Sequence, residues 1–119
     1  MEIIEEKQSG INIFKLNGRL DSNTSQGFEQ KIFQAISDGS KSVVVDFKDL
    51  DYISSAGLRV ILKATKEANA AGLRMAAANR KPHIDKVFEI LKALPDMAVF
   101  ANEQELDDYL DAMQAATRE

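Results

Sequence analysis

The stretch that decides the fold is DFKDLDYISSAGL, residues 46–58. It follows Val43-Val44-Val45, a β-branched run typical of a central strand that is covered on both faces of a sheet. After it, apolar and small side chains recur at helical spacing, namely Leu58, Ile61, Leu62, Thr65 and Ala68. We therefore expect a strand that ends near Phe47, a polar loop over residues 48–54, and a helix that Ala71-Gly72 ends.

Toward the N-terminus, two apolar runs at residues 3–4 and 11–16 flank Ser9-Gly10. Glycine tolerates positive φ, so this pattern predicts an opening β-hairpin. The segment Gly18 to Asn23 then breaks the pattern. Asn23 and Gln26 resemble a capping pair for a helix over residues 24–37, which Asp38-Gly39 would end.

Toward the C-terminus, alternation at Leu73, Met75 and Ala77 predicts another strand. Pro82 favours the first turn of a helix that ends before Pro95. A short strand is expected at Met97 to Phe100, followed by a helix that Asn102 and Glu105 would cap. The apolar stripes of these last two helices are Ile84, Val87, Phe88 and Leu91, and then Leu106, Tyr109, Leu110 and Met113.

The resulting order, ββαβαβαβα, predicts an α/β fold: a single-layer mixed β-sheet of about five strands packed by about four helices. The chain has 119 residues, 45% of them hydrophobic, which suits one domain over residues 1–119 with a single core. Phe28, Phe33, Phe88 and Met113 are expected to belong to that core.

Composition limits the possible chemistry. The formal net charge of −4 argues against nucleic acid as a partner. The absence of cysteine excludes disulfides, thiol nucleophiles and cysteine-ligated metal. No apolar stretch approaches the roughly 18–20 residues that span a bilayer, so we expect no membrane association and a cytoplasmic location.

Ser54 and Ser55 stand where the middle strand passes into a helix. A helix start carries unpaired N–H groups and the positive end of the dipole, so a serine phosphorylated there would have its charge partly stabilised. Small Ala56 and Gly57 beside it predict an accessible hydroxyl. The alternative is that either serine is simply the N-cap of the helix, and the two interpretations do not exclude each other.

At this motif the sequence resembles the STAS domain, and within it the bacterial anti-sigma-factor antagonists. The matching residues are Asp46-Phe47, Ile53, Ser54-Ser55-Ala56-Gly57-Leu58 and Val60-Ile61-Leu62, and Gly18-Arg19-Leu20-Asp21 matches the family's segment before the first helix. Two positions depart from the family pattern. Ser54 stands where many members have aspartate, and Ala56 where many have serine or threonine.

The resemblance implies a non-catalytic binding module without a cofactor or metal, which regulates transcription by partner switching. Its unphosphorylated form would bind an anti-sigma factor that is also a serine kinase of the histidine-kinase-like ATPase fold, and so relieve the inhibition that this partner exerts. Phosphorylation of Ser55 would weaken binding, and a PP2C-type phosphatase would restore it. The expected partner-binding residues are Asp21, Ser22, Asn23, Ile53, Ser54, Ser55, Ala56, Gly57, Leu58 and Arg59.

Two other functions remain open at this point. One is a ligand- or nucleotide-sensing STAS module in a larger signalling complex, although the sequence has no glycine-rich phosphate loop. The other is a small enzyme with Ser55 as nucleophile, which would need a nearby base. His83 is the only histidine, and we expect it to face solvent or cap a helix. Asp46 is expected to end a strand, and Asp49 and Asp51 are expected in a solvated loop rather than at a metal.

Overall fold

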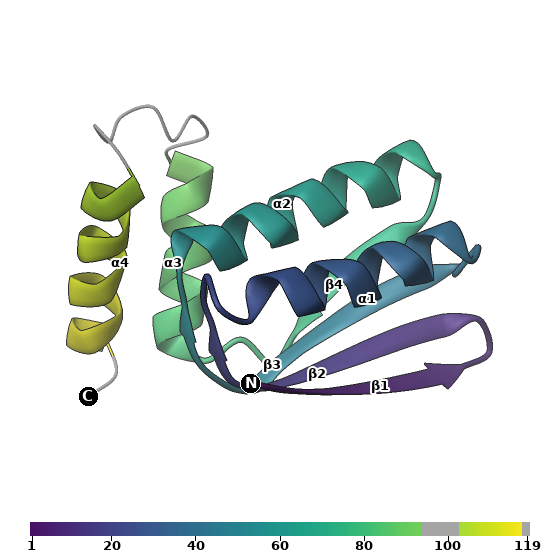
Figure 1. The fold of residues 1–119 in the computed structure, drawn as a ribbon, viewed down its shortest axis with the longest axis horizontal. Helices are drawn as coiled ribbons and strands as arrows, with labels where there is room; N and C mark the ends of the chain where they lie inside the picture. Colours follow the sequence, from purple (N-terminus) through teal and green to yellow (C-terminus); the bar gives the residue numbers. More distant parts are fainter. Residues whose placement is uncertain (94–102, 118–119) are drawn as a thin grey trace.

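The computed structural model describes residues 1–93 and 103–117, and it has one sheet with helices packed against it (Figure 1). The elements run in the order β1 Glu2–Gln8, β2 Ile11–Leu20, α1 Ser25–Ser37, β3 Ser42–Ile53, α2 Ser55–Ala70, β4 Arg74–Ala78, α3 Pro82–Ala93 and α4 Glu103–Thr117. The predicted mixed α/β fold is confirmed. The predicted strand at residues 97–100 and the predicted cap at Asn102 lie outside the described residues.

The sheet has the strand order β1-β2-β3-β4 within the described part of the chain. Strand β1 pairs antiparallel with β2, whereas β2 with β3 and β3 with β4 are parallel. Ser9 and Gly10 form the predicted hairpin turn with φ values of 52° and 84°. Among the described strands, the hairpin therefore supplies the one antiparallel pair, and helical crossovers supply the parallel ones.

The helices α1 and α2 lie side by side over the same face of the sheet, while α3 and α4 stand together at one end (Figure 1). The expectation that β3 is covered on both faces is wrong. Its side chains alternate, with Val43, Val45 and Phe47 buried and Val44 and Asp46 only half-buried. A β-branched run predicts a strand. It does not show whether α1 and α2, the helices that connect β3 to its neighbouring strands, pack on the same face of the sheet.

The strand β3 continues to Ile53, so the predicted polar loop over residues 48–54 is wrong. Leu50 and Tyr52 are buried within it. Its register with β2 shifts twice, between Lys15 and Asn17 and between Gly18 and Arg19 of the partner strand. Each shift breaks the period-2 pattern by which a strand is recognised in a sequence, which explains why the second half of β3 resembles a loop in the sequence.

The core lies between the sheet and the helices. Phe14 and Phe28 meet edge-on with ring centroids 6.1 Å apart, and Phe47 and Phe88 do so at 5.6 Å. Phe33 and Met113 pack at its border, as predicted. Two residues assigned to apolar stripes are exposed instead, Leu62 (39%) and Tyr109 (42%). Both residues lie at the edge of a buried stripe, so helical spacing alone made the predicted apolar stripe one residue too wide.

None of the helices in the described ranges is long and apolar enough to cross a bilayer.

Candidate functional site

The site is built at the junction between β3 and α2, where Ser54 and Ser55 have different roles. Ser54 is the N-cap of α2, and its hydroxyl accepts a hydrogen bond from the Gly57 N–H at 3.3 Å. Its own N–H donates to the Leu20 carbonyl at 2.9 Å, which ties the junction to the end of β2. Ser55 is the first residue of α2. The capping interpretation therefore applies to Ser54, and Ser55 is not needed for it.

Gly57 allows α2 to approach β2 closely. A Cβ atom at this position would lie 2.7 Å from Leu20 Cγ and 2.9 Å from the Leu20 carbonyl oxygen. Atoms do not approach this closely without displacement, so the helix start would have to move away from the sheet. The glycine of the motif thus fixes the position of Ser55 relative to the β2–α1 turn.

The β2–α1 turn is organised by Asp21. Its Oδ1 accepts the N–H groups of Asn23 at 2.9 Å and Thr24 at 3.2 Å. The Thr24 hydroxyl donates to the Arg19 carbonyl at 2.8 Å. The predicted Asn23 and Gln26 capping pair is wrong, because Thr24 holds the N-cap position without a side-chain cap bond and Asp21 accepts the preceding N–H groups.

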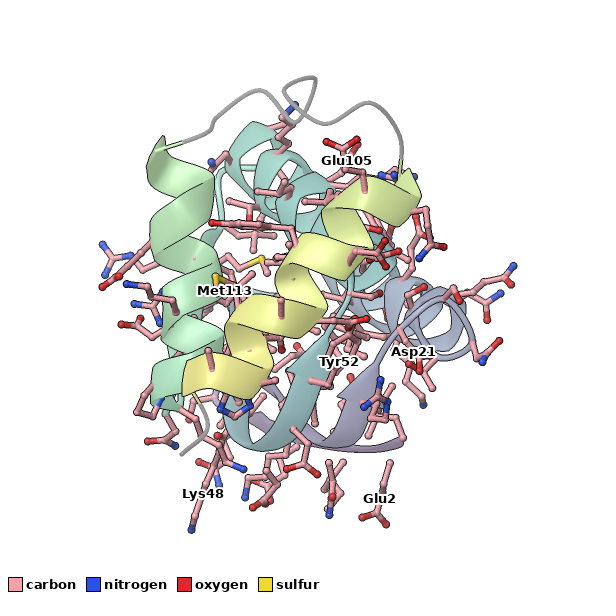
Figure 2. All side chains as sticks on the ribbon, turned by 90° about the vertical axis from the view of Figure 1, so that its left-hand side faces the viewer. Glu2, Asp21, Lys48, Tyr52, Glu105 and Met113 are labelled. Carbon is pink, nitrogen blue, oxygen red and sulfur yellow. The ribbon has the colours of Figure 1, made fainter. Side chains whose placement is uncertain are left out.

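A hollow of about 250 Å³ separates this turn from the start of α2. Three aspartates and one arginine line it together with hydroxyl-bearing and small side chains: Arg19, Asp21, Ser22, Tyr52, Ser54, Ser55, Ala56, Asp107 and Asp111. In Figure 2, Tyr52 and Asp21 lie on the same side of α4. The hollow is therefore acidic, and α4 contributes two of its carboxylates.

Two residues of α4 bind the junction directly, and the sequence interpretation missed both. Asp107 Oδ1 accepts the Ser55 N–H at 2.8 Å. Gln114 is 1% exposed, and its amide accepts from the Ile53 N–H at 3.0 Å and donates to the Ile53 carbonyl at 2.8 Å. A signal for Gln114 existed, since it follows Leu110 by four residues on the buried stripe. Asp107 gave none, because a carboxylate beside an apolar stripe is ordinary helix surface.

Tyr52, which lines the hollow, is kept neutral. Burial raises the pKa of its hydroxyl most, and a hydrogen bond with Asp111 and the negative charges of Asp111 and Asp107 raise the pKa further. Arg19, whose guanidinium carbon lies 4.1 Å from the Tyr52 ring centroid, opposes this shift. Tyr52 therefore contributes an uncharged O–H group to an otherwise acidic surface.

The predicted partner-binding residues divide by exposure. Ser22, Asn23 and Arg59 are exposed, and Asp21 and Ala56 are half-buried. Ile53, Gly57 and Leu58 are buried, so they support the surface from beneath and cannot meet a partner with their side chains. Ser54 and Ser55 are also buried, and the expectation of an accessible Ser55 is wrong because only 2% of it is exposed. The local sequence could not show that α4 packs beside it.

His83 is not at the surface, contrary to expectation. It is 4% exposed, and its Nε2 lies 2.7 Å from the Asp51 carbonyl oxygen. Asp46 lies in a strand, as predicted, whereas Asp49 and Asp51 belong to the same strand, β3, rather than to a loop. Within residues 1–93 and 103–117, no group of histidine, aspartate or glutamate side chains is arranged to hold a metal ion.

Comparison with known proteins identifies the family. The model of the STAS domain family matches residues 2–106. BtrV of Bordetella bronchiseptica, a candidate anti-sigma factor antagonist, is 36% identical over 90 residues, which cover 76% of this chain and 78% of that protein. The anti-sigma F factor antagonist of Paenibacillus polymyxa is 29% identical over 104 residues, covering 87% and 89%.

Solved structures agree with the sequence matches. The Bacillus cell fate determinant SpoIIAA in its phosphorylated form superposes with a TM-score of 0.67 at 25% identity, covering 79% of this chain and 86% of that one. SpoIIAA in its unphosphorylated form, described as an anti-sigma factor antagonist, gives 0.66 at 25% identity, with coverage of 75% and 83%.

Proposed function

Since this chain belongs to the STAS domain family, we propose that it is an anti-sigma factor antagonist controlled by phosphorylation of Ser55. The observation that supports the proposal is that Ser54 and Ser55 have different roles at the junction between β3 and α2. Ser54 caps α2, while Ser55 lines the acidic hollow with its hydroxyl outside the capping scheme. The two forms of SpoIIAA show that a relative of this fold exists with and without phosphate.

The partner in this proposal is an anti-sigma factor that is also a serine kinase of the histidine-kinase-like ATPase fold, with a PP2C-type phosphatase as the resetting enzyme. The exposed residues Ser22, Asn23 and Arg59, together with half-buried Ala56, form the contact surface around the hollow. Phosphate adds about 1.5–2 negative charges at the centre of this surface, which weakens binding by charge and bulk. The protein acts in the cytoplasm, where its partner and the sigma factor are found.

Two features argue against a serine nucleophile activated by histidine in this chain. The hollow around Ser55 is lined by acidic, hydroxyl and small side chains and by Arg19, and no histidine lines it. His83 presents Nε2 to a carbonyl oxygen, which only accepts, so this nitrogen carries a proton and is not a base. An activated serine nucleophile needs such a base within hydrogen-bond reach.

Two of the hollows, the one at Ser55 and an apolar one beside β4, give no support to a nucleotide-sensing role. The apolar hollow between α2, α3, β3 and β4, lined by residues such as Phe47, Met75 and Phe88, measures about 120 Å³. Binding sites for drug-sized ligands usually measure about 300–1,000 Å³. The hollow at Ser55 is larger, but its three aspartates would repel a phosphate group.

The test of the proposal is binding by the two forms of the full chain. Protein carrying serine or phosphoserine at position 55 is immobilised, captured proteins are identified by mass spectrometry, and the captured kinase is then purified and titrated against both forms. We expect the serine form to retain a protein of the histidine-kinase-like ATPase fold and the phosphoserine form to bind it at least tenfold more weakly. Equal affinity for the two forms would refute the mechanism.

Asp21→Asn is expected to change recognition without changing stability. The asparagine oxygen can still accept the N–H groups of Asn23 and Thr24, so the melting temperature should stay nearly constant. Loss of the charge beside Ser22 should alter partner affinity or phosphorylation rate. Thermal denaturation and binding are measured on the same preparations. A lower melting temperature with unchanged binding per folded molecule would make Asp21 a purely structural residue.

A further inference from the structure

The helix α4 covers the switch serine. Leu106 and Leu110 on its inner face are 7% and 1% exposed, so this face is part of the core. From the same helix, Asp107 reaches the Ser55 N–H and Gln114 holds both backbone groups of Ile53. Ser55 is 2% exposed in this arrangement. A kinase active site that must surround the Ser55 hydroxyl cannot do so while α4 is docked.

Asp107 already occupies the place that a phosphate on Ser55 would seek. The start of a helix offers free N–H groups and partial positive charge to anions, and here the Ser55 N–H is bonded to the Asp107 carboxylate. A phosphate linked to Ser55 would compete for this donor. The two anions cannot both be stabilised by one N–H group at contact distance.

The charges around the hollow also favour competition between a phosphate on Ser55 and the carboxylates of α4. Arg19 is the one basic side chain among its lining residues, against the three carboxylates of Asp21, Asp107 and Asp111. Phosphorylation adds about 1.5–2 negative charges to this surface. Two of the three repelled carboxylates belong to α4, so the repulsion acts on that helix and pushes it away from the junction.

We propose that α4 is a lid over Ser55, and that phosphate on Ser55 and docking of the first half of α4 exclude each other. The kinase reaches Ser55 only when the lid opens, and the phosphorylated form keeps it open. The proposal rests on the proposed function in taking Ser55 as the phosphate acceptor. It adds a rate-controlling element within the chain and a second surface that differs between the two forms.

Opening of the lid can be measured without a kinase, because the chain contains no cysteine. Ser55→Cys introduces the only thiol, and its alkylation by iodoacetamide, a neutral reagent, reports how often the position is uncovered. The rate is taken on the plateau above the thiol pKa, so that a change in that pKa does not affect it. Asp107→Ala, added to Ser55→Cys, should raise this rate about tenfold, because a hydrogen bond to a charged group is lost.

The matched control is Asp108→Ala on the same background. Asp108 is the next residue of α4, is exposed, and bonds to Gln104 on its own helix rather than to the junction. Both substitutions change helix propensity equally. The control should leave the alkylation rate unchanged. The lid proposal would be contradicted by equal alkylation rates for the Asp107→Ala and Asp108→Ala proteins. It would also be contradicted by full reactivity of the introduced thiol in the otherwise unchanged chain.

The second measurement follows α4 itself. Hydrogen exchange of amides 107–110, the hydrogen-bonded amides in the first half of α4, is compared between chains carrying serine and phosphoserine at position 55. We expect at least tenfold faster exchange of these amides in the phosphoserine form, with α1 unchanged. Unchanged protection of α4 would refute the exclusion of phosphate and lid. Neither measurement involves a partner, so a lid can fail here while partner switching holds, and partner switching can fail while the lid is confirmed.

Discussion

Ser55→Ala is expected to abolish phosphate incorporation by the partner kinase while leaving partner binding nearly unchanged. The methyl group keeps a small neutral surface at the start of α2, and the cap is retained because Ser54 supplies it. Phosphate on the wild type and both single alanine variants is mapped by mass spectrometry after incubation with the kinase. The expected loss is complete, since no other residue of the hollow combines a hydroxyl with this position on the helix.

Ser54→Ala is the matched control for this experiment. It should lose about 0.5–2 kcal/mol of stability with its capping bond, yet it should still be phosphorylated on Ser55. Ser55→Asp adds about one charge in place of about 1.5–2, so it should weaken partner binding less than phosphate does. Phosphate on Ser54 in the wild type, or phosphorylation that persists in the Ser55→Ala protein, would contradict the assignment of the site.

Gln114→Leu is expected to lower the free energy of unfolding by about 2–5 kcal/mol. The side chain is 1% exposed and satisfies the N–H and carbonyl of Ile53. Leucine fills a similar volume but leaves both groups buried without a partner, and that loss is large compared with a domain stability of about 5–15 kcal/mol. Urea denaturation measures the change.

Gln104→Leu provides the comparison for Gln114→Leu. It makes the same substitution in the same helix, but Gln104 is exposed and bonds to Asp108 across one turn of the helix surface. Its effect should stay within about 0.5 kcal/mol. If the two variants lost equal stability, the buried amide would have no special importance, and α4 would be held without it, by contacts such as those of Leu106 and Leu110 and the bond of Asp107 to the Ser55 N–H.

The sequence predicted the helices and strands along which the spacing of apolar residues stays constant. The hairpin around Gly10, the stripe of α2 and the start of α3 at Pro82 were all recognisable because local chemistry decides them. The second half of β3 was missed because register shifts interrupt its alternation. Burial of Ser55 and His83 was missed for a different reason. Each depends on a helix or strand brought in from a distant part of the chain.

In the candidate site, too, the features decided by neighbouring residues were predicted, and those that depend on distant residues were missed. The motif identified Ser55 and the turn at Asp21 through neighbouring residues, and the structure brings both to one hollow. The roles of Asp107 and Gln114 depend on residues 52 and 61 positions away. A single sequence contains no local signal for contacts of that range, and only the buried position of Gln114 on an apolar stripe could have suggested one.

The clamp between Gln114 and Ile53 also sets an order for the folding of the chain. Ile53 is the last residue of β3, and the partner of its backbone groups is a side chain 61 residues later. A ribosome releases the sheet strands and α2 before α4, so in a growing chain the N–H and carbonyl groups of Ile53 lack their Gln114 partner until α4 docks. Closing so long a loop makes helix docking a late and slow event relative to the local hairpin. Newly made molecules therefore pass through a stage in which Ser55 is uncovered, before any stimulus has acted on the finished protein.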